Sequence, residues 1–230
     1  MFSRVLAIII VALSLLLSGC ATPTKMAFSE DSDPASKIIS KPIFLMTATL
    51  RNSYRTSFQP KLIVVHVERS VVKDSADKIN FTMDDKAKNG SDSTTEGSSY
   101  LLRMELEQGE YVIRGLSSLA RLFPINGFFF TPLHAQLRSS RQGVFYIGHV
   151  EATVRERKDD EFKAGLSIPL IDQAIAGAST GTFDISISDQ WEKDEPKFRE
   201  KFSALKEVTI EKAILAPFDR AKAQKWWEEN

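Results

Sequence analysis

Residues 144–154 read VFYIGHVEATV, and their alternation is the clearest sign of a β-strand in the chain. Successive side chains point to opposite faces of a strand, so a period of two separates a buried face from an outward one. The pattern therefore predicts a half-buried strand. We expect Val144, Tyr146, Gly148, Val150, Ala152 and Val154 on one face and Phe145, Ile147, His149, Glu151 and Thr153 on the other.

Other short runs are rich in β-branched and aromatic residues and end at polar residues or prolines, which is typical of strands. Two of these runs are separated only by Gln108-Gly109-Glu110, which predicts a β-hairpin with Gly109 at positive φ. The expected strands are 43–50, 62–68, 100–107, 111–116, 162–168, 182–187 and 208–215.

Helical signals are confined to the end of the chain. Asp189 and Glu192 resemble a capping box, and helices are expected over about 195–205 and over 219–229. Together with the strands, they predict a mainly β protein, an antiparallel β-sandwich with one or two short C-terminal α-helices. The expected buried face of the first helix consists of Phe198, Phe202 and Leu205.

The composition is that of a folded globular protein. The chain has 230 residues, of which 43% are hydrophobic and 26% charged. Its 30 basic residues equal its 30 acidic residues, so the charge gives no basis for general binding of nucleic acid. We expect residues 42–230 to form one domain.

The N-terminus has the features of a bacterial export signal. Arg4 precedes an apolar run over 5–17 that is too short to span a bilayer. The run ends in Leu17-Ser18-Gly19-Cys20, which resembles the lipobox of bacterial lipoproteins, and Cys20 is the only cysteine in the chain. In that motif the cysteine thiol accepts a diacylglyceryl group.

This resemblance implies a lipid-anchored protein. We expect residues 1–19 to be a lipoprotein signal peptide, Cys20 to carry the lipid, and the polar segment 20–41 to be a flexible tether. Ala21 stands where many lipoproteins of the inner membrane carry Asp. The motif therefore points to the outer membrane, with the domain facing the periplasm.

The sequence lacks the common signatures of enzymes. His66, His134 and His149 are far apart and have no metal-ligand spacing, and no nucleophile elbow or phosphate-binding loop is present. We therefore expect no catalytic residue, no metal and no cofactor. The histidines are interpreted as solvated or hydrogen-bonded side chains.

Residues 85–96 partly resemble a calcium-binding loop, with Gly90 at the sixth place. Ala87 offers no side-chain oxygen at the third place, so a long polar loop over 84–98 is the favoured interpretation. The residues at oxygen-ligand positions are Asp85, Asn89, Ser93 and Glu96.

Residues 123–132, FPINGFFFTP, are the most apolar part of the chain after the signal, and their prolines and glycine argue against a regular central strand. They either fill one end of the core or form an exposed patch that docks a partner or a membrane. Two adjacent tryptophans near the C-terminus cannot both face one core, so one of them is a candidate for an exposed interface residue. The candidate interface residues are Phe128, Phe129, Phe130, Trp226 and Trp227.

Between residues 111 and 157 the sequence has six arginines but only two glutamates. This local excess could bind an anionic envelope ligand, such as a glycan phosphate or a lipid headgroup, or it could simply solvate a sheet. The arginines are Arg114, Arg121, Arg138, Arg141, Arg155 and Arg157.

Residues 106–114, LEQGEYVIR, followed by residues 143–148, GVFYIG, resemble a G-x-Y-x-x-R, then V-x-Y-x-G run. This run is found in uncharacterised bacterial lipoproteins whose domain is similar to the transthyretin-like or carboxypeptidase-regulatory β-sandwich. Residues 181–184, GTFD, with Asp189 and Asp194 resemble the C-terminal half of such proteins. The resemblance implies an accessory or binding module without a catalytic centre.

The sequence therefore predicts a non-enzymatic, lipid-anchored periplasmic lipoprotein that binds an envelope protein or a polymer such as a glycan. One alternative is an envelope hydrolase, in which His66 or His149 would meet a carboxylate in a cleft. Another is a subunit of an envelope assembly complex, which an exposed patch at 128–130 or 226–227 would indicate.

Overall fold

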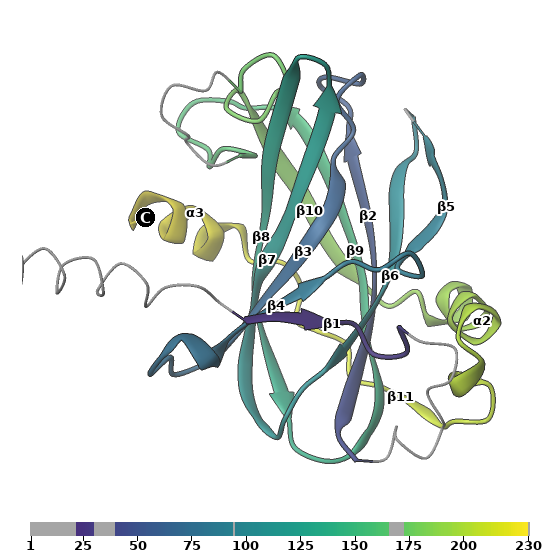
Figure 1. Cartoon of the computed structure of the whole chain (residues 1–230). Helices are drawn as coiled ribbons and strands as arrows, with labels where there is room; N and C mark the ends of the chain where they lie inside the picture. Colours follow the sequence, from purple (N-terminus) through teal and green to yellow (C-terminus); the bar gives the residue numbers. More distant parts are fainter. Residues whose placement is uncertain (1–21, 30–39, 94, 166–172, 230) are drawn as a thin grey trace, which may run out of the picture.

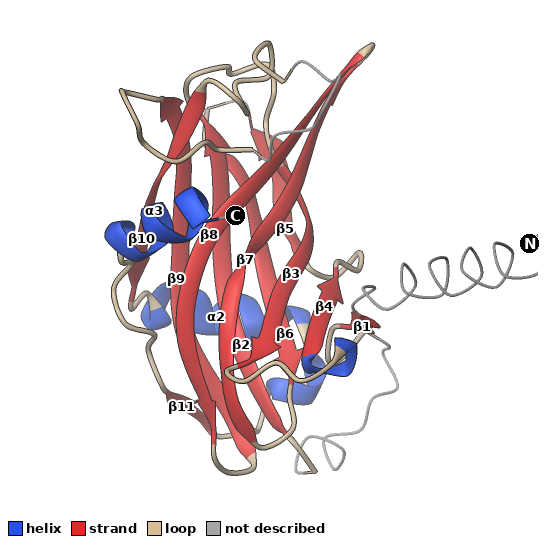
Figure 2. Cartoon of the chain, turned by 90° about the vertical axis from the view of Figure 1, so that its left-hand side faces the viewer, coloured by secondary structure: helices blue, strands red, loops and turns tan. Residues whose placement is uncertain are grey.

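The computed structural model describes residues 22–29, 40–93, 95–165 and 173–229. Two twisted sheets face each other, and helices α2 (Trp191–Lys201) and α3 (Arg220–Glu229) lie on opposite sides of this sandwich (Figure 1). The prediction of a mainly β sandwich with two short helices late in the chain is confirmed. Figure 2 shows the first sheet from the side on which α3 lies, with α3 at its β8 edge.

The first sheet has the strand order β1-β4-β3-β7-β8, and the second has the order β10-β9-β2-β6-β5, with β11 also paired to β9. Most neighbours are antiparallel, but β1–β4, β2–β9 and β11–β9 are parallel. The strands are β1 (Thr22–Lys25), β2 (Pro42–Asn52), β3 (Lys61–Arg69), β4 (Lys78–Thr82), β5 (Lys88–Ser93), β6 (Gly97–Glu105), β7 (Gly109–Leu122), β8 (Ile125–Ser139), β9 (Gly143–Glu156), β10 (Gly181–Ser188) and β11 (Ile210–Lys212).

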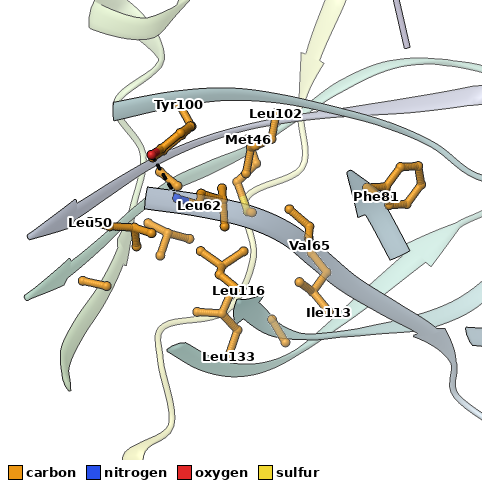
Figure 3. Packing of buried hydrophobic residues seen from close by; sticks show 14 of the residues in the cluster. Met46, Leu50, Leu62, Val65, Phe81, Tyr100, Leu102, Ile113, Leu116 and Leu133 are labelled. Atoms are coloured by element: carbon orange, nitrogen blue, oxygen red, sulfur yellow. Dashed lines mark hydrogen bonds between the residues drawn. The ribbon is translucent and has the colours of Figure 1, made fainter. Parts of the chain in front are cut away.

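The main core lies between the two sheets. It includes the aliphatic side chains of Met46, Leu50, Val65 and Leu116, and the Tyr100 hydroxyl accepts a hydrogen bond from the Leu62 N–H at 2.9 Å (Figure 3). A second cluster lies on the other face of the second sheet, under α2. Because β2 is covered on both faces, it is a nearly continuous apolar run rather than an alternating one.

The predicted alternation of residues 144–154 holds for only part of β9. A bulge in the pairing with β2 inserts Ile147 as an extra residue, so that Leu45 pairs with Tyr146 and Met46 with Gly148. Before the bulge the odd positions face the main core, and after it the even positions do. As a result, Tyr146 and His149 lie on the same side, toward α2.

The predicted hairpin around Gly109 is wrong. β6 pairs with β2 and β5 in the second sheet, whereas β7 pairs with β3 and β8 in the first. Gly109 does have a positive φ of 152°, but the chain crosses there between the sheets. Leu106 is buried in the core at this crossing, because a connection between two facing sheets runs past the core.

The prediction of a flexible tether over 20–41 is wrong for residues 22–29. β1 adds to the edge of the first sheet beside β4, and Met26 and Phe28 are buried in the two apolar clusters. The polar composition predicted that the entropy cost of ordering this segment would keep it flexible. Burial of Met26 and Phe28 offsets that cost. Residues 30–39 lie outside the described part of the chain.

Two further segments differ from the prediction. Residues 162–165 are not a strand, although Phe162 is buried, and 166–168 lie outside the described residues. The predicted loop over 84–98 contains β5, which pairs with β6, so it is largely a hairpin.

The C-terminal elements follow the prediction more closely. β11 is a short form of the expected strand over 208–215, and α3 occupies the second predicted helix. α2 begins at Trp191, four residues earlier than expected, and Asp189 Oδ1 accepts from the Trp191 N–H at 3.0 Å. The predicted apolar face of the first helix, Phe198, Phe202 and Leu205, is buried as expected.

Candidate functional site

A histidine-centred cluster joins three strands of the first sheet. His66 Nδ1 donates to Asn80 Oδ1 at 2.8 Å, and His66 Nε2 accepts from the Ser117 hydroxyl at 2.7 Å. These roles follow from the amide oxygen, which can only accept. Burial lowers the pKa of His66, so the imidazole is neutral at pH 7. In such an arrangement Ser117 has the place of a nucleophile, the neutral His66 that of a base, and Asn80 that of the group that orients the base.

This cluster lacks one part of an acyl-transfer site. Ser117 is in the middle of β7, where it pairs with Val64 on β3 and with Phe130 on β8. The main-chain N–H groups around it therefore enter the ladders, whereas an oxyanion hole needs donors aimed at the substrate oxygen. Sequence reasoning considered His66 but missed its partners, because they come from strands that are remote in sequence.

A second polar cluster lies between the second sheet and α2. Asp194 is fully buried, and its Oδ2 accepts from the Thr47 hydroxyl at 2.5 Å and from the Tyr146 hydroxyl at 2.7 Å. Lys197 Nζ pairs with the other carboxylate oxygen at 2.9 Å. Burial, followed by the contact with the carboxylate, raises the pKa of Tyr146, so the phenol stays protonated.

His149 completes this cluster without touching the carboxylate. Its Nδ1 lies 2.8 Å from Thr47 Oγ1, and because the hydroxyl proton goes to Asp194, the ring nitrogen must donate. Thr47 therefore cannot pass its proton to His149, as a catalytic nucleophile would. The cluster fixes α2 to the sheet. Asp194 is four residues before Phe198, so both lie on the same face of the helix. A carboxylate on this apolar face was the sequence signal that could have revealed the buried cluster.

The third histidine lies where α3 docks on β8. The ring of His134 is 4.9 Å from that of Trp226, and its carbonyl oxygen accepts from Lys222 Nζ at 2.8 Å. Arg114 Nη1 lies 3.3 Å from His134 Nδ1. Burial and these two cations lower the pKa of His134 to about 4.

The predicted aromatic interface is largely covered by the protein itself. Phe129 is in the main core, so for this residue the core-filling alternative holds. Phe128, Phe130, Trp226 and Trp227 are half-buried. Phe130 lies 5.5 Å from Trp226, ring to ring, so the two predicted patches contact each other. The segment does avoid a central position, as predicted, because β8 is an edge strand.

The exposed aromatic residue of this segment is Phe123. It is 98% exposed, and it is the only fully exposed aromatic side chain among the described residues. Leu122 beside it is the last residue of β7 and is 49% exposed, and Phe123 begins the turn between β7 and β8 at one end of the sandwich (Figure 1). Arg121 precedes them and is also exposed, so the turn presents an apolar tip next to a cation.

The six arginines do not form one patch. Arg114 pairs with Glu68, Arg141 with Glu211, and Arg155 with Glu161 and Asp184. Arg157 Nη1 donates to the carbonyl oxygen of Glu161. The remaining two, Arg121 and Arg138, are exposed at opposite ends of the β7–β8 pair.

A shallow depression lies between the 158–161 turn and the start of α3. Glu161 lines it and accepts from Arg155, from Arg220 and from the Lys158 N–H, which lowers the pKa of the Glu161 carboxyl to about 2. The carboxylate of Glu161 and the guanidinium of Arg220 are thus paired within the protein.

Cys20 lies outside the described residues. Among the residues that are described, no three His, Cys, Asp or Glu side chains are grouped to hold a metal ion. The oxygen-ligand positions of the predicted calcium-like segment are spread along the β5–β6 hairpin. In the described part of the chain, neither helix combines the length and the apolarity needed to cross a membrane.

Comparison of the chain with protein-family models, with curated proteins and with solved structures gave no match. The resemblance to transthyretin-like lipoproteins therefore stays a prediction, and so does every statement on partner and location.

Proposed function

We propose that this protein is a non-enzymatic lipoprotein of the outer membrane, anchored by an acylated Cys20, and that its domain binds an envelope protein in the periplasm. The lipobox-like Leu17-Ser18-Gly19-Cys20 supports the anchor. The observation that carries the binding role is the 98% exposure of Phe123 at the β7–β8 turn. A phenylalanine with a neighbouring leucine suits an apolar pocket on a partner, where aromatic residues contribute much of the binding energy.

The fold supports this role by keeping the turn away from the anchored edge. Arg69, at the end of β3, pairs with Tyr111 of β7, and Leu122 lies eleven positions after Tyr111 on the same strand. At about 3.3 Å per residue, the turn lies about 35 Å along the strand from the β3–β4 connection beside β1. An anchor at β1 would therefore leave the Phe123 end accessible to other proteins.

In-cell photo-crosslinking tests this proposal. A benzophenone amino acid at position 123 of the full-length protein is expected to capture one envelope protein in good yield. The same probe at Lys206, an exposed residue beside α2, is the matched control and should not capture it. Adducts of equal yield at both positions, or glycan adducts alone, would contradict the proposed protein partner.

An envelope hydrolase is the second candidate, and one observation favours it: the 2.7 Å contact between Ser117 Oγ and His66 Nε2, with Asn80 behind the ring. A fluorophosphonate probe, which reacts with activated serines, tests it directly. Labelling that Ser117→Ala abolishes would support the hydrolase. The binding-module proposal predicts no labelling in either protein, because the ladder occupies the N–H groups that would stabilise an oxyanion.

A further inference from the structure

Two adjacent valines are exposed on the connection between β3 and β4. Val71 is 69% exposed and Val72 is 39% exposed. The connection is at the edge of the first sheet, and β1 is the neighbour of β4 there (Figures 1 and 2). Single exposed apolar residues are ordinary, but a pair on a projecting connection is a candidate contact surface.

The connection has a fixed shape. Asp77 Oδ2 accepts from the Lys73 N–H at 2.8 Å, and Asp77 Oδ1 lies 3.3 Å from Arg69 Nε. Asp74 caps the 3-10 turn Ser75–Asp77 by accepting from the Ala76 N–H at 2.8 Å. Both carboxylates are thus engaged within the connection, and the valines project from a preformed turn.

The expected lipid attachment point is very close to this surface. β1 begins at Thr22, whose partner on β4 is Ile79, and Ile79 comes just after the connection. Only Ala21 separates Thr22 from Cys20. Two Cα–Cα steps span at most about 7 Å, so a lipid on Cys20 would place the membrane surface beside this edge of the sheet.

We propose that the β3–β4 connection rests on the lipid surface next to the anchor, with Val71 and Val72 in the boundary between headgroups and acyl chains. Lys73 directly follows the valines and Lys78 begins β4; both are exposed and suit the lipid phosphates. This second contact rests on the proposed acylation of Cys20. It fixes the orientation of the domain, so that the Phe123 end points away from the membrane.

An environment-sensitive fluorophore can test the contact. Val72→Cys and Phe123→Cys each introduce a thiol for labelling with NBD, because the thiol of Cys20 is blocked when it carries lipid. The full-length lipidated variants are reconstituted in vesicles of phosphatidylethanolamine and phosphatidylglycerol, with and without nitroxide-labelled lipid. Val71→Cys is a second test position should Val72→Cys fold poorly, and intact mass spectrometry measures acylation in every sample.

NBD at position 72 is expected to emit at shorter wavelength than NBD at position 123 and to be quenched by the nitroxide lipid. Quenching at neither position in acylated protein would overturn the membrane contact while leaving the anchor intact. Quenching at position 123 alone would reverse the proposed orientation. A blue shift at position 72 without nitroxide quenching would assign the surface to a protein contact and also overturn the proposal. Absence of acylation would contradict the proposed function itself.

Discussion

Acid should undock α3 through His134. Its ring contacts that of Trp226 at a tilt of 44°, and the charges that act on it are those of Arg114, Lys222 and Glu68. A proton on this ring would face both cations in a buried place. The folded protein therefore disfavours the charged form, and the pKa of His134 falls from its ordinary value of 6.5 to about 4.

The sign and size of the effect follow from linkage. Between these two pKa values the unfolded chain binds more protons than the folded one, so the stabilisation is complete above pH 6.5 and is lost as the pH falls toward 4. Between about pH 7.5 and about pH 5, this one group should lower the free energy of unfolding by about 2 kcal/mol. His66 and His149 also have lowered pKa values and add to the total.

The comparison with His134→Asn isolates the contribution of this group. Asparagine does not titrate, and it tolerates the left-handed backbone of this position, where φ is 47°. Urea unfolding followed by tryptophan fluorescence gives the free energy of each protein at both pH values. The wild type is expected to lose about 2 kcal/mol more than the variant on acidification. Parallel losses in the two proteins would refute the reasoning.

The remaining predictions concern stability and can be measured by urea unfolding at neutral pH. Asp194→Ala strands two buried hydroxyl groups and should cost about 3 kcal/mol. Asp189→Ala removes two exposed contacts, the ion pair with Lys212 and the hydrogen bond from the Trp191 N–H, and should cost about 1 kcal/mol. Equal losses would contradict the role given to the buried carboxylate. Gly97→Ala should destabilise the protein by more than Gly90→Ala. Both residues have positive φ, but only at Gly97 would the added Cβ atom clash with a carbonyl oxygen of β2. The reverse order would count against the close approach of β6 to β2. The fully buried guanidinium of Arg103 pairs with the partly buried Asp84 and donates to the carbonyl oxygens of Ala27 and Leu101. Arg103→Met leaves these groups unpaired and should cost about 2 to 3 kcal/mol. An unchanged free energy of unfolding would show that the ion pair adds nothing.

Local patterns in the sequence predict most of the elements but not how they pair. The alternation in 144–154 predicts a strand, yet only the partner strand reveals the bulge that reverses the faces at Gly148. The turn at Gly109 has the composition of a hairpin, and the two runs around it belong to different sheets. Local propensity constrains φ and ψ, whereas the choice between sheets depends on which apolar faces meet across the core.

The candidate sites depend even more on long-range contacts. Nothing in the sequence links His66 to Ser117, which is 51 residues away. Phe130 is covered by Trp226 of α3, which lies far along the chain, and exposure of Phe123 follows from its place at the end of a hairpin. The same segment therefore holds covered and exposed aromatic residues, which composition alone cannot separate.

The lipid anchor is the central claim, and the mass of the mature protein tests it most directly. The protein is purified from membranes and analysed by intact mass spectrometry, with Cys20→Ser as the control. The wild type should begin at Cys20 and carry acyl groups. The control should remain an unprocessed precursor. An unmodified cysteine in the membrane-derived protein, or a control that still matures and partitions into detergent, would contradict the account.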